Sequence, residues 1–473
     1  MQDGLLPIKV DTTSNGEFVP FALPALAEAA NREARTLIEE RARHLGLTRR
    51  RFLASTAAAA TALFAFSRVH AAAGRRGGAF AIDLAATFDE DAAIAALGGR
   101  EFIFDVQGHY VVPPSLAATL KPRCRTNAVD LSRNYMRCLG ADDFIKDIFL
   151  DSDTAMMVLS FVPSRRDAEP LTIAEAAATR AIVEQLEGTQ RLLLHGRVAP
   201  NQPGDLDDMD ELAERWGVVA WKCYTQWGPD GQGFALTDEA TGVAMIERGR
   251  KLGVRTVCVH KGIPFGRQSY KHSTCSDIGP IAARFPDVNF LVYHSGYVPG
   301  RAEGPYDPTR GEGCDELIRS VEAAGLAPGS NVYAELGTTW RTLMRDTDEA
   351  AHCLGKLLKH LGPDNVLYGS DCVWYGSPQD QIQALRAFQI SEEFQARYGY
   401  PALTPRLKAK LFGLNAARVY GINVEEIGRR ARGDKVARAR EEYRNHPMPD
   451  FRTRGPRTRE EFAALINGRK GPL

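Results

Sequence analysis

The chain has 473 residues, of which 44% are hydrophobic and 25% are charged, as is typical of globular proteins. Its 59 basic and 59 acidic residues balance to a formal net charge of zero, which gives no support for binding nucleic acid or an anionic membrane surface. We therefore expect a small molecule as the main binding partner. None of the eight cysteines forms a CxxC pair, so neither a zinc ribbon nor a thioredoxin-type redox motif is predicted.

Residues 1–73 are predicted to be a twin-arginine (Tat) export signal region. Three consecutive arginines at 49–51 precede a weakly apolar run at 54–66, and small residues follow it. The run is too short to span a bilayer, so no stable membrane span is expected after cleavage. The Tat translocon would be a transient partner, and the protein would end in the periplasm or outside the cell. The alternative is an alanine-rich helix preceded by arginines by chance. Upstream, residues 23–44 are predicted to form an amphipathic helix.

From residue 100 onward, short apolar runs alternate with amphipathic patterns, as expected for buried parallel strands that are each followed by a helix. Eight such units predict an α/β protein with a (β/α)8 TIM barrel at 74–427. A doubly wound sheet is the alternative, but no GxGxxG follows its first strand. Residues 428–473 form a charged C-terminal extension, which we expect to lie beyond the barrel. The predicted strands are 101–111, 155–162, 191–199, 218–225, 255–260, 289–294, 331–336 and 365–370.

Polar side chains stand where the predicted strands end, and this is the edge at which TIM barrels carry their active sites. One buried histidine at such a position is usually a satisfied core residue, whereas several on one rim predict a shared site. Six of the eight strands end in a group that can bind metal or move a proton. These groups are Gln107 and His109, His195, Lys222, His260, His294 and Asp371.

Two imidazoles and a carboxylate from this set, His109, His260 and Asp371, suit one divalent metal ion and leave positions for water and substrate. A bound Zn²⁺ lowers the pKa of water to about 7 and so supplies hydroxide at neutral pH. Asp371 would then accept a proton, and His294 would polarise a carbonyl or act as acid or base. Gln107 offers a neutral amide oxygen as a further ligand, which makes Mn²⁺ or Mg²⁺ an alternative to Zn²⁺.

Three segments of the chain resemble the amidohydrolase superfamily over roughly 102–422. VYHSGY at 292–297 resembles the His-Gly-Gly turn after the sixth strand, and NVLYGSDCVW at 365–374 resembles the Gly-Ser-Asp-x-Pro turn after the eighth. KAKLFGLNAARVYGI at 408–422 resembles the closing helix. The similarity is to the amidohydrolase-related (amidohydrolase-2) branch, which includes aminocarboxymuconate-semialdehyde decarboxylase-like and lactonase-like enzymes.

The resemblance implies that His109, His260 and Asp371 are metal ligands and that His294 lies near the substrate. Gln107 departs from the family, which usually has His or Glu there. This departure leaves two interpretations, a modified metal site or a metal-free, lactonase-like site, and we favour the first. The resemblance also implies a homodimer.

Substrate contacts are predicted at several further positions. Lys222 matches either the carboxylated lysine that bridges two metals in binuclear relatives or a cation that holds a substrate carboxylate, and we favour the second. Arg267 and Tyr270, in the polar loop after the fifth strand, could bind an anionic or phenolic substrate. Trp221 could line an aromatic pocket, and His195 would face the same rim.

We therefore expect a metal-dependent hydrolase that uses metal-bound hydroxide on an amide, ester, lactone or carbon–carbon bond of a small carboxylate-bearing or aromatic substrate. A metal-assisted decarboxylase of an aromatic or dienoic acid would use the same ligands and is the first alternative. A catalytically inactive barrel that acts as a binding protein is the second, and only Gln107 favours it.

Overall fold

The central element of the fold is a parallel eight-stranded barrel. The structure is a computed structural model, and it describes residues 5–110, 141–187, 190–264, 270–445, 447 and 449–468. Strands that are neighbours in the sheet are also consecutive in the sequence, and all these pairs are parallel. The strands are β2 (Phe104–Gly108), β3 (Met156–Leu159), β4 (Leu192–Arg197), β5 (Ala220–Tyr224), β6 (Thr256–His260), β7 (Asn289–Tyr293), β8 (Val332–Glu335) and β9 (Val366–Leu367). Each lies inside a predicted strand, so the predicted TIM barrel is confirmed.

The first and last strands close the barrel through backbone hydrogen bonds near their C-terminal ends. The Asp371 N–H donates to the Gln107 carbonyl at 2.9 Å, and the His109 N–H donates to the Cys372 carbonyl at 2.5 Å. Three of these four residues are predicted site residues, and the fourth, Cys372, directly follows Asp371. Closure of the barrel therefore brings the ends of the first and eighth predicted strands together.

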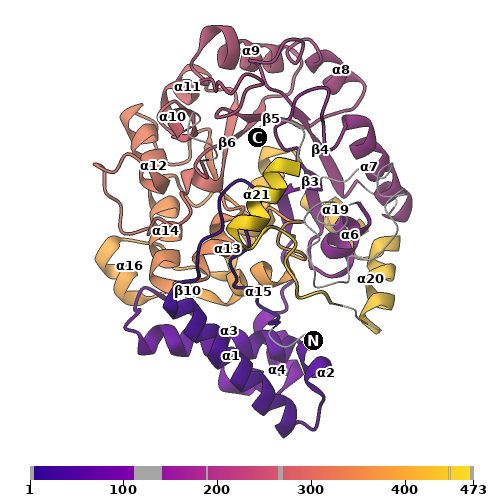
Figure 1. The fold of residues 1–473 in the computed structure, drawn as a ribbon, viewed down its shortest axis with the longest axis vertical. Coiled ribbons are helices and arrows are strands. Elements are labelled where there is room, and N and C mark those ends of the chain that lie inside the picture. Colours follow the sequence, from indigo (N-terminus) through magenta and orange to yellow (C-terminus); the bar gives the residue numbers. More distant parts are fainter. Residues whose placement is uncertain are drawn as a thin grey trace.

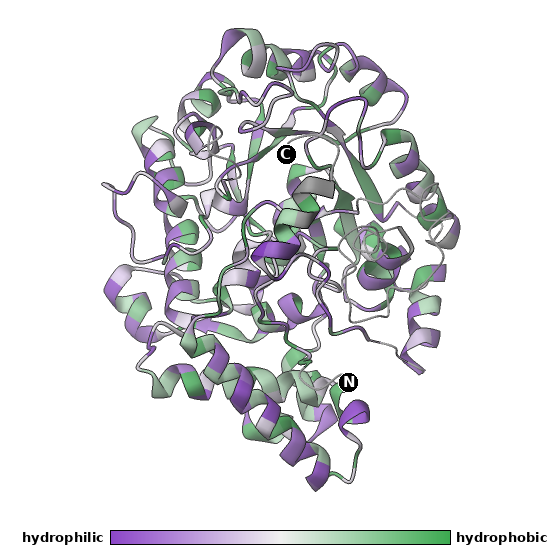
Figure 2. Cartoon of the chain, in the orientation of Figure 1, coloured by the Kyte–Doolittle hydropathy of each residue, from purple (hydrophilic) through white to green (hydrophobic). Residues whose placement is uncertain are grey.

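Helices surround the barrel, with hydrophilic faces outward and apolar faces against the strands (Figures 1 and 2). Helix α14 shows the principle, because Asp346 caps its N-terminus while Leu354 and Leu357 are fully buried. The helices around the barrel are α6 (Ala141–Ile145), α7 (Ile173–Glu187), α8 (Met209–Glu214), α9 (Ala244–Lys251), α10 (Tyr270–Ser273), α11 (Ile278–Arg284), α12 (Gly313–Ala323), α13 (Thr339–Leu343), α14 (Thr347–His360), α15 (Gln379–Ala387), α16 (Glu392–Tyr398), α17 (Pro405–Ala409) and α18 (Asn415–Val419).

The residues upstream of the barrel form a helical layer that packs against it (Figure 1). The layer contains α1 (Ala25–His44), α2 (Arg49–Leu53), α3 (Thr56–Ala72) and α4 (Glu90–Leu97), and a short pair of antiparallel strands, β1 (Gly78–Phe80) with β10 (Phe388–Ile390), joins it to the barrel. The amphipathic helix expected at 23–44 is confirmed as α1. In the full chain, residues 5–73 thus share the hydrophobic core instead of standing outside the fold. Their removal after export stays a prediction.

The predicted signal helix is short and buried. Helix α3 carries the apolar run, and Ala58, Ala60 and Leu63 have no exposed surface. In the part of the chain that the structure describes, no helix has both the length and the apolar character needed to cross a membrane.

Both ends of the chain cross the barrel mouth, and they lie side by side there (Figure 1). Residues 5–24, which we call the N-terminal strap, are held by Lys9, which pairs with Asp380 at 3.0 Å, and by the Ser14 N–H, which donates to the Pro456 carbonyl at 2.9 Å.

The C-terminal extension folds back onto the barrel as α19 (Val424–Ala431), α20 (Lys435–Asn445) and α21 (Arg459–Gly468). A buried ion pair between Arg191 and Asp434, at 2.7 Å, attaches it below the mouth. The described residues of this extension therefore follow the barrel in sequence and pack back against it in the same chain.

Candidate active site

The C-terminal ends of the barrel strands bring most of the predicted site residues together. Gln107, His109, His260, His294 and Asp371 are all at most 2% exposed. Two of them have left-handed backbone conformations at sharp turns after their strands, with φ of 66° at His294 and 55° at Asp371. Such conformations are costly for residues other than glycine and cluster at functional sites.

Asp371 contacts four other side chains in the first half of the site. Its Oδ1 lies 3.3 Å from His109 Nε2 and accepts a hydrogen bond from Gln107 Nε2 at 3.0 Å. Its Oδ2 accepts from Thr338 Oγ1 at 2.5 Å and from Asn15 Nδ2 at 2.9 Å. Burial alone would raise the pKa of Asp371, but the hydrogen bonds with His109 and Thr338 outweigh it, so the pKa lies below its usual value.

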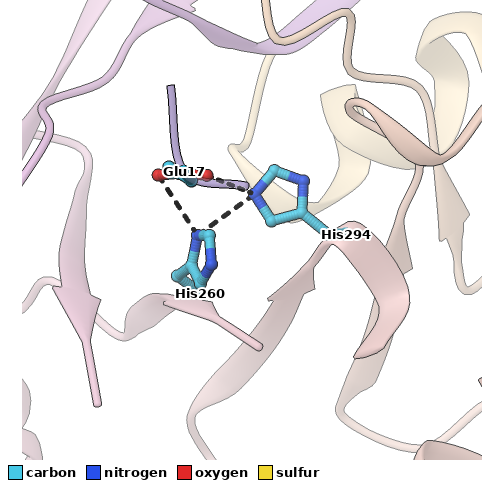
Figure 3. Close-up of side chains that lie close together, drawn as sticks. All are labelled: Glu17, His260 and His294. Atoms are coloured by element: carbon cyan, nitrogen blue, oxygen red, sulfur yellow. Dashed lines mark hydrogen bonds and ion pairs between the residues drawn. The ribbon is translucent and has the colours of Figure 1, made fainter. Parts of the chain in front are cut away.

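His260 and His294 form the second half of the site, together with Glu17 of the N-terminal strap (Figure 3). His260 Nδ1 lies 3.1 Å from His294 Nε2. The Glu17 carboxylate lies 3.7 Å from His260 Nδ1 and 4.0 Å from His294 Nε2. Burial lowers the pKa of His260 well below its usual value and that of His294 to about 4, so both rings are neutral at pH 7.

Each of the three histidines has one ring nitrogen against a backbone carbonyl. His109 Nδ1 lies 3.1 Å from the Ser160 oxygen, His260 Nε2 lies 3.4 Å from that of Ile263, and His294 Nδ1 lies 2.8 Å from that of Gly337. A carbonyl oxygen only accepts, so the single proton of the neutral His260 and His294 rings sits on the outer nitrogen. The inner nitrogens His260 Nδ1 and His294 Nε2 then present lone pairs to the site, whereas His109 Nε2 lies 3.3 Å from Asp371 Oδ1.

This arrangement fits a divalent metal ion. In metal-binding histidines, the N–H of the second ring nitrogen usually donates a hydrogen bond to a carbonyl or carboxylate. This bond fixes the tautomer that can bind metal. Among the described residues, Glu17, His260 and His294 are the one group of three histidine, cysteine or acidic residues whose ligand atoms lie within 4.8 Å of one another. The predicted ligands His109 and Asp371 contact each other beside this group.

Lys222 lies on the inner face of β5 and has no exposed surface. Its Nζ makes no hydrogen bond to any described residue and lies 3.8 Å from the ring centre of Tyr293 and 4.6 Å from that of Tyr224. Burial lowers the pKa of Lys222. Tyr224 also stacks on His260, with ring centres 4.7 Å apart, so this aromatic wall joins Lys222 to the histidines.

Glu335, at the end of β8, is a site residue that sequence reasoning missed. It is fully buried and accepts hydrogen bonds from the backbone N–H groups of His294, at 3.1 Å, and Gly337, at 2.7 Å. Burial raises its pKa to about 8. A carboxylate that ends an otherwise apolar strand was the available signal.

Other predicted substrate residues lie elsewhere. Trp221 faces away from the barrel interior, because it neighbours the inward-facing Lys222 on β5, and its Nε1 donates to the Val254 carbonyl at 3.0 Å. Tyr270 is 47% exposed and donates to Glu312 at 2.9 Å. His195 is buried inside the barrel, where its Nδ1 lies 3.0 Å from Ser160 Oγ. Arg267 lies outside the described residues.

The fold and the strand-end groups are those of a TIM-barrel enzyme. A family model described as amidohydrolase matches residues 147–422, which is more than half of the chain, so the chain belongs to the amidohydrolase family. It is accordingly an enzyme of the amidohydrolase superfamily, whose members generally bind a divalent metal.

Several solved structures are similar in fold. 5-Carboxyvanillate decarboxylase from Sphingomonas paucimobilis is 12% identical, with a TM-score of 0.39 and coverage of 68% of this chain and 99% of that one. A 2,6-dihydroxybenzoate decarboxylase is 12% identical, with a TM-score of 0.43 and coverage of 68% and 100%. 4-Oxalomesaconate hydratase from Rhodopseudomonas palustris is 16% identical, with a TM-score of 0.39 and coverage of 68% and 96%. No curated protein matches the chain.

Proposed function

We propose that the protein is a metal-dependent hydrolase that acts on a small carboxylate-bearing or aromatic substrate with an amide, ester, lactone or carbon–carbon bond to be broken. One observation carries this proposal. His260 and His294 turn lone pairs inward because each donates its other ring N–H to a carbonyl, and His109 and the carboxylate of Asp371, in contact with each other, lie beside them. Burying so many acceptors in one place is costly unless a cation joins them.

The ion would be held by His109, His260 and Asp371, with the Gln107 amide oxygen as a further ligand. When bound, it would supply a water of lowered pKa and polarise the bond to be cleaved. Zinc suits the two imidazoles and the carboxylate best, and Mn²⁺ or Mg²⁺ would be favoured by the amide oxygen.

Asp371 is proposed to accept the proton of the attacking water, since its pKa below the usual value keeps it ionised at neutral pH. Thr338 and Asn15 hold its Oδ2 by hydrogen bonds at 2.5 and 2.9 Å and would fix the direction of that transfer. His294, neutral and oriented by the Gly337 carbonyl, is placed to contact the substrate or to pass the proton to a leaving group.

The environment of Lys222 favours a substrate that carries a carboxylate. A buried ammonium group without a hydrogen-bonding partner among the described residues is costly, and a substrate carboxylate would supply both the hydrogen bond and the opposite charge. The rings of Tyr224 and Tyr293 beside it would contact the apolar part of the same molecule.

A panel of carboxylate-bearing lactones, esters and amides, with matched aromatic carboxylic acids, tests this proposal. Hydrolysis that stops after chelation, returns with Zn²⁺ or Mn²⁺ and is absent from His260→Ala and Asp371→Ala would support it. Lys222→Met should raise KM for the carboxylate substrate far more than for its methyl ester. Release of bicarbonate without hydrolysis would instead identify a decarboxylase and overturn the hydrolase assignment.

A further inference from the structure

We infer that Glu17, carried by the N-terminal strap, is a ligand of the metal ion together with His260 and His294. This inference rests on the metal dependence proposed above and applies to a chain that keeps residues 5–24. Glu17 and His294 would join His260 at the ion, so His294 would be a ligand and not the acid or base proposed above. The Glu17 carboxylate reaches both ring nitrogens, at 3.7 and 4.0 Å, and these nitrogens are 3.1 Å apart (Figure 3). Two imidazoles and one carboxylate are a known donor set of catalytic zinc sites.

The orientation of the two rings supports a cation between them and Glu17. The outer nitrogens, His260 Nε2 and His294 Nδ1, face carbonyl oxygens and carry the ring protons. The inner nitrogens therefore meet each other, and the carboxylate, as acceptors. A cation bound there would turn mutual repulsion into three favourable contacts.

A short loop fixes the position of Glu17. Asn15 Nδ2 donates to Glu17 Oε2 at 2.6 Å, and Asn15 Oδ1 accepts from the Glu17 N–H at 3.1 Å. Gly16 makes this tight turn with φ of 82°. The same Asn15 amide donates to Asp371, so one side chain holds Glu17 and links it to the barrel rim.

The strap that carries this loop is anchored on both sides. Lys9 pairs with Asp380, Asp11 pairs with Arg341, and Thr13 Oγ1 lies 2.6 Å from Thr453 Oγ1 of the C-terminal extension. Glu17 is only 7% exposed as a result. The anchored strap therefore holds Glu17 at the histidines. Glu17 is not a surface side chain that bends inward.

Metal binding to the full-length chain tests this inference without reference to turnover. The protein would be stripped with a chelator and titrated with Zn²⁺ in competition with a chromophoric chelator, and Co²⁺ absorption spectra would report the ligand set. Glu17→Gln should weaken Zn²⁺ binding by at least about 10- to 100-fold, the range reached even by changes outside the ligand shell. It should also alter the Co²⁺ spectrum. Glu28→Gln, which changes an exposed glutamate on α1, is the matched control.

A second variant separates a ligand from a merely structural residue. Glu17→His offers a different ligand atom and should bind Zn²⁺ more tightly than Glu17→Gln, with a Co²⁺ spectrum of its own. The rise in Tm on adding Zn²⁺ should follow the same order, because ligand binding stabilises the folded state. Wild-type affinity and an unchanged spectrum in Glu17→Gln, or equal weakening in both variants, would overturn the inference alone. A wild-type chain that binds no metal would overturn it together with the proposed function.

Discussion

Asn15 Nδ2 donates a 2.9 Å hydrogen bond to Asp371 Oδ2, so the strap closes directly over the proposed proton acceptor. The contact joins the first residues of the chain to the end of the last barrel strand. It also means that the strap contributes to the burial of Asp371, which is 1% exposed.

Replacing Asn15 should therefore loosen the strap. In Asn15→Ala, Asp371 and Glu17 each lose a charge-assisted hydrogen bond, and we expect the free energy of unfolding to fall by about 1.5–3 kcal/mol. Limited proteolysis should cut within 5–24 faster than in the wild type. Thr36→Ala, an exposed change on α1, should stay within about 0.5 kcal/mol. Equal cleavage of all three proteins would show that this contact does not hold the strap.

Acid should destabilise the packing of the N-terminal layer through His70 of α3. Burial lowers the pKa of His70 to about 4, and neither ring nitrogen has a hydrogen-bonding partner among the described residues. As the pH falls from about 6.5 to 4, the unfolded chain binds a proton that the folded chain does not, so stability decreases over this range. The loss is at most about 3.5 kcal/mol, from about 1.4 kcal/mol per pKa unit. Denaturant unfolding across this range should show a flatter slope in His70→Leu, and an identical slope would contradict the prediction.

Gly369, two residues before Asp371, should tolerate no side chain. A methyl group there would collide with the carboxylate of Glu335 and press on Gln107. Both contacts are with buried side chains at the barrel end, so we expect Gly369→Ala to lose about 1–3 kcal/mol of stability and most of its turnover. Gly421→Ala is a poor match because of its positive φ, whereas Gly304→Ala meets open space and serves as the control. Retention of full turnover in Gly369→Ala would show that the Glu335–Gln107 region can rearrange without cost.

The twin-arginine pair should determine whether the protein is exported. We expect Arg49→Lys combined with Arg50→Lys to keep the protein inside cells that export the wild type. Cell fractionation with an antibody to the barrel measures this. A matched Arg75→Lys change, downstream of α3, should leave export intact. Export of the double variant would rule out the Tat interpretation and leave α3 as an ordinary packed helix.

The sequence predicted the barrel well, because eight buried strands leave continuous apolar runs and helices leave amphipathic ones. It also predicted the residues of the rim, since His109, His260, His294 and Asp371 follow directly from where their strands end. The two-residue period of a strand places Trp221 and Lys222 on opposite faces, so the outward position of Trp221 was within reach of the same reasoning.

Glu17 and Asn15 could not be found in this way. They belong to the strap, residues 5–24, for which the sequence offered no signal. The strong signal of the N-terminal region, the arginines at 49–51 in α2, indicates export and not a fold. Their contacts with His260 and Asp371 depend on how the chain ends pass over the barrel mouth, which no local pattern records. The strand that carries Glu335 was predicted, but its carboxylate was not recognised as a site group, because it was taken as part of an apolar run.

The central claim is that His109, His260 and Asp371 hold a catalytic metal ion. The most direct test measures the metal content of the full-length protein by mass spectrometry, beside a His260→Ala, Asp371→Ala double variant. We predict about one equivalent of zinc or manganese in the wild type and almost none in the variant. Wild-type protein that carries no metal, and gains none when Zn²⁺ or Mn²⁺ is added, would contradict the account.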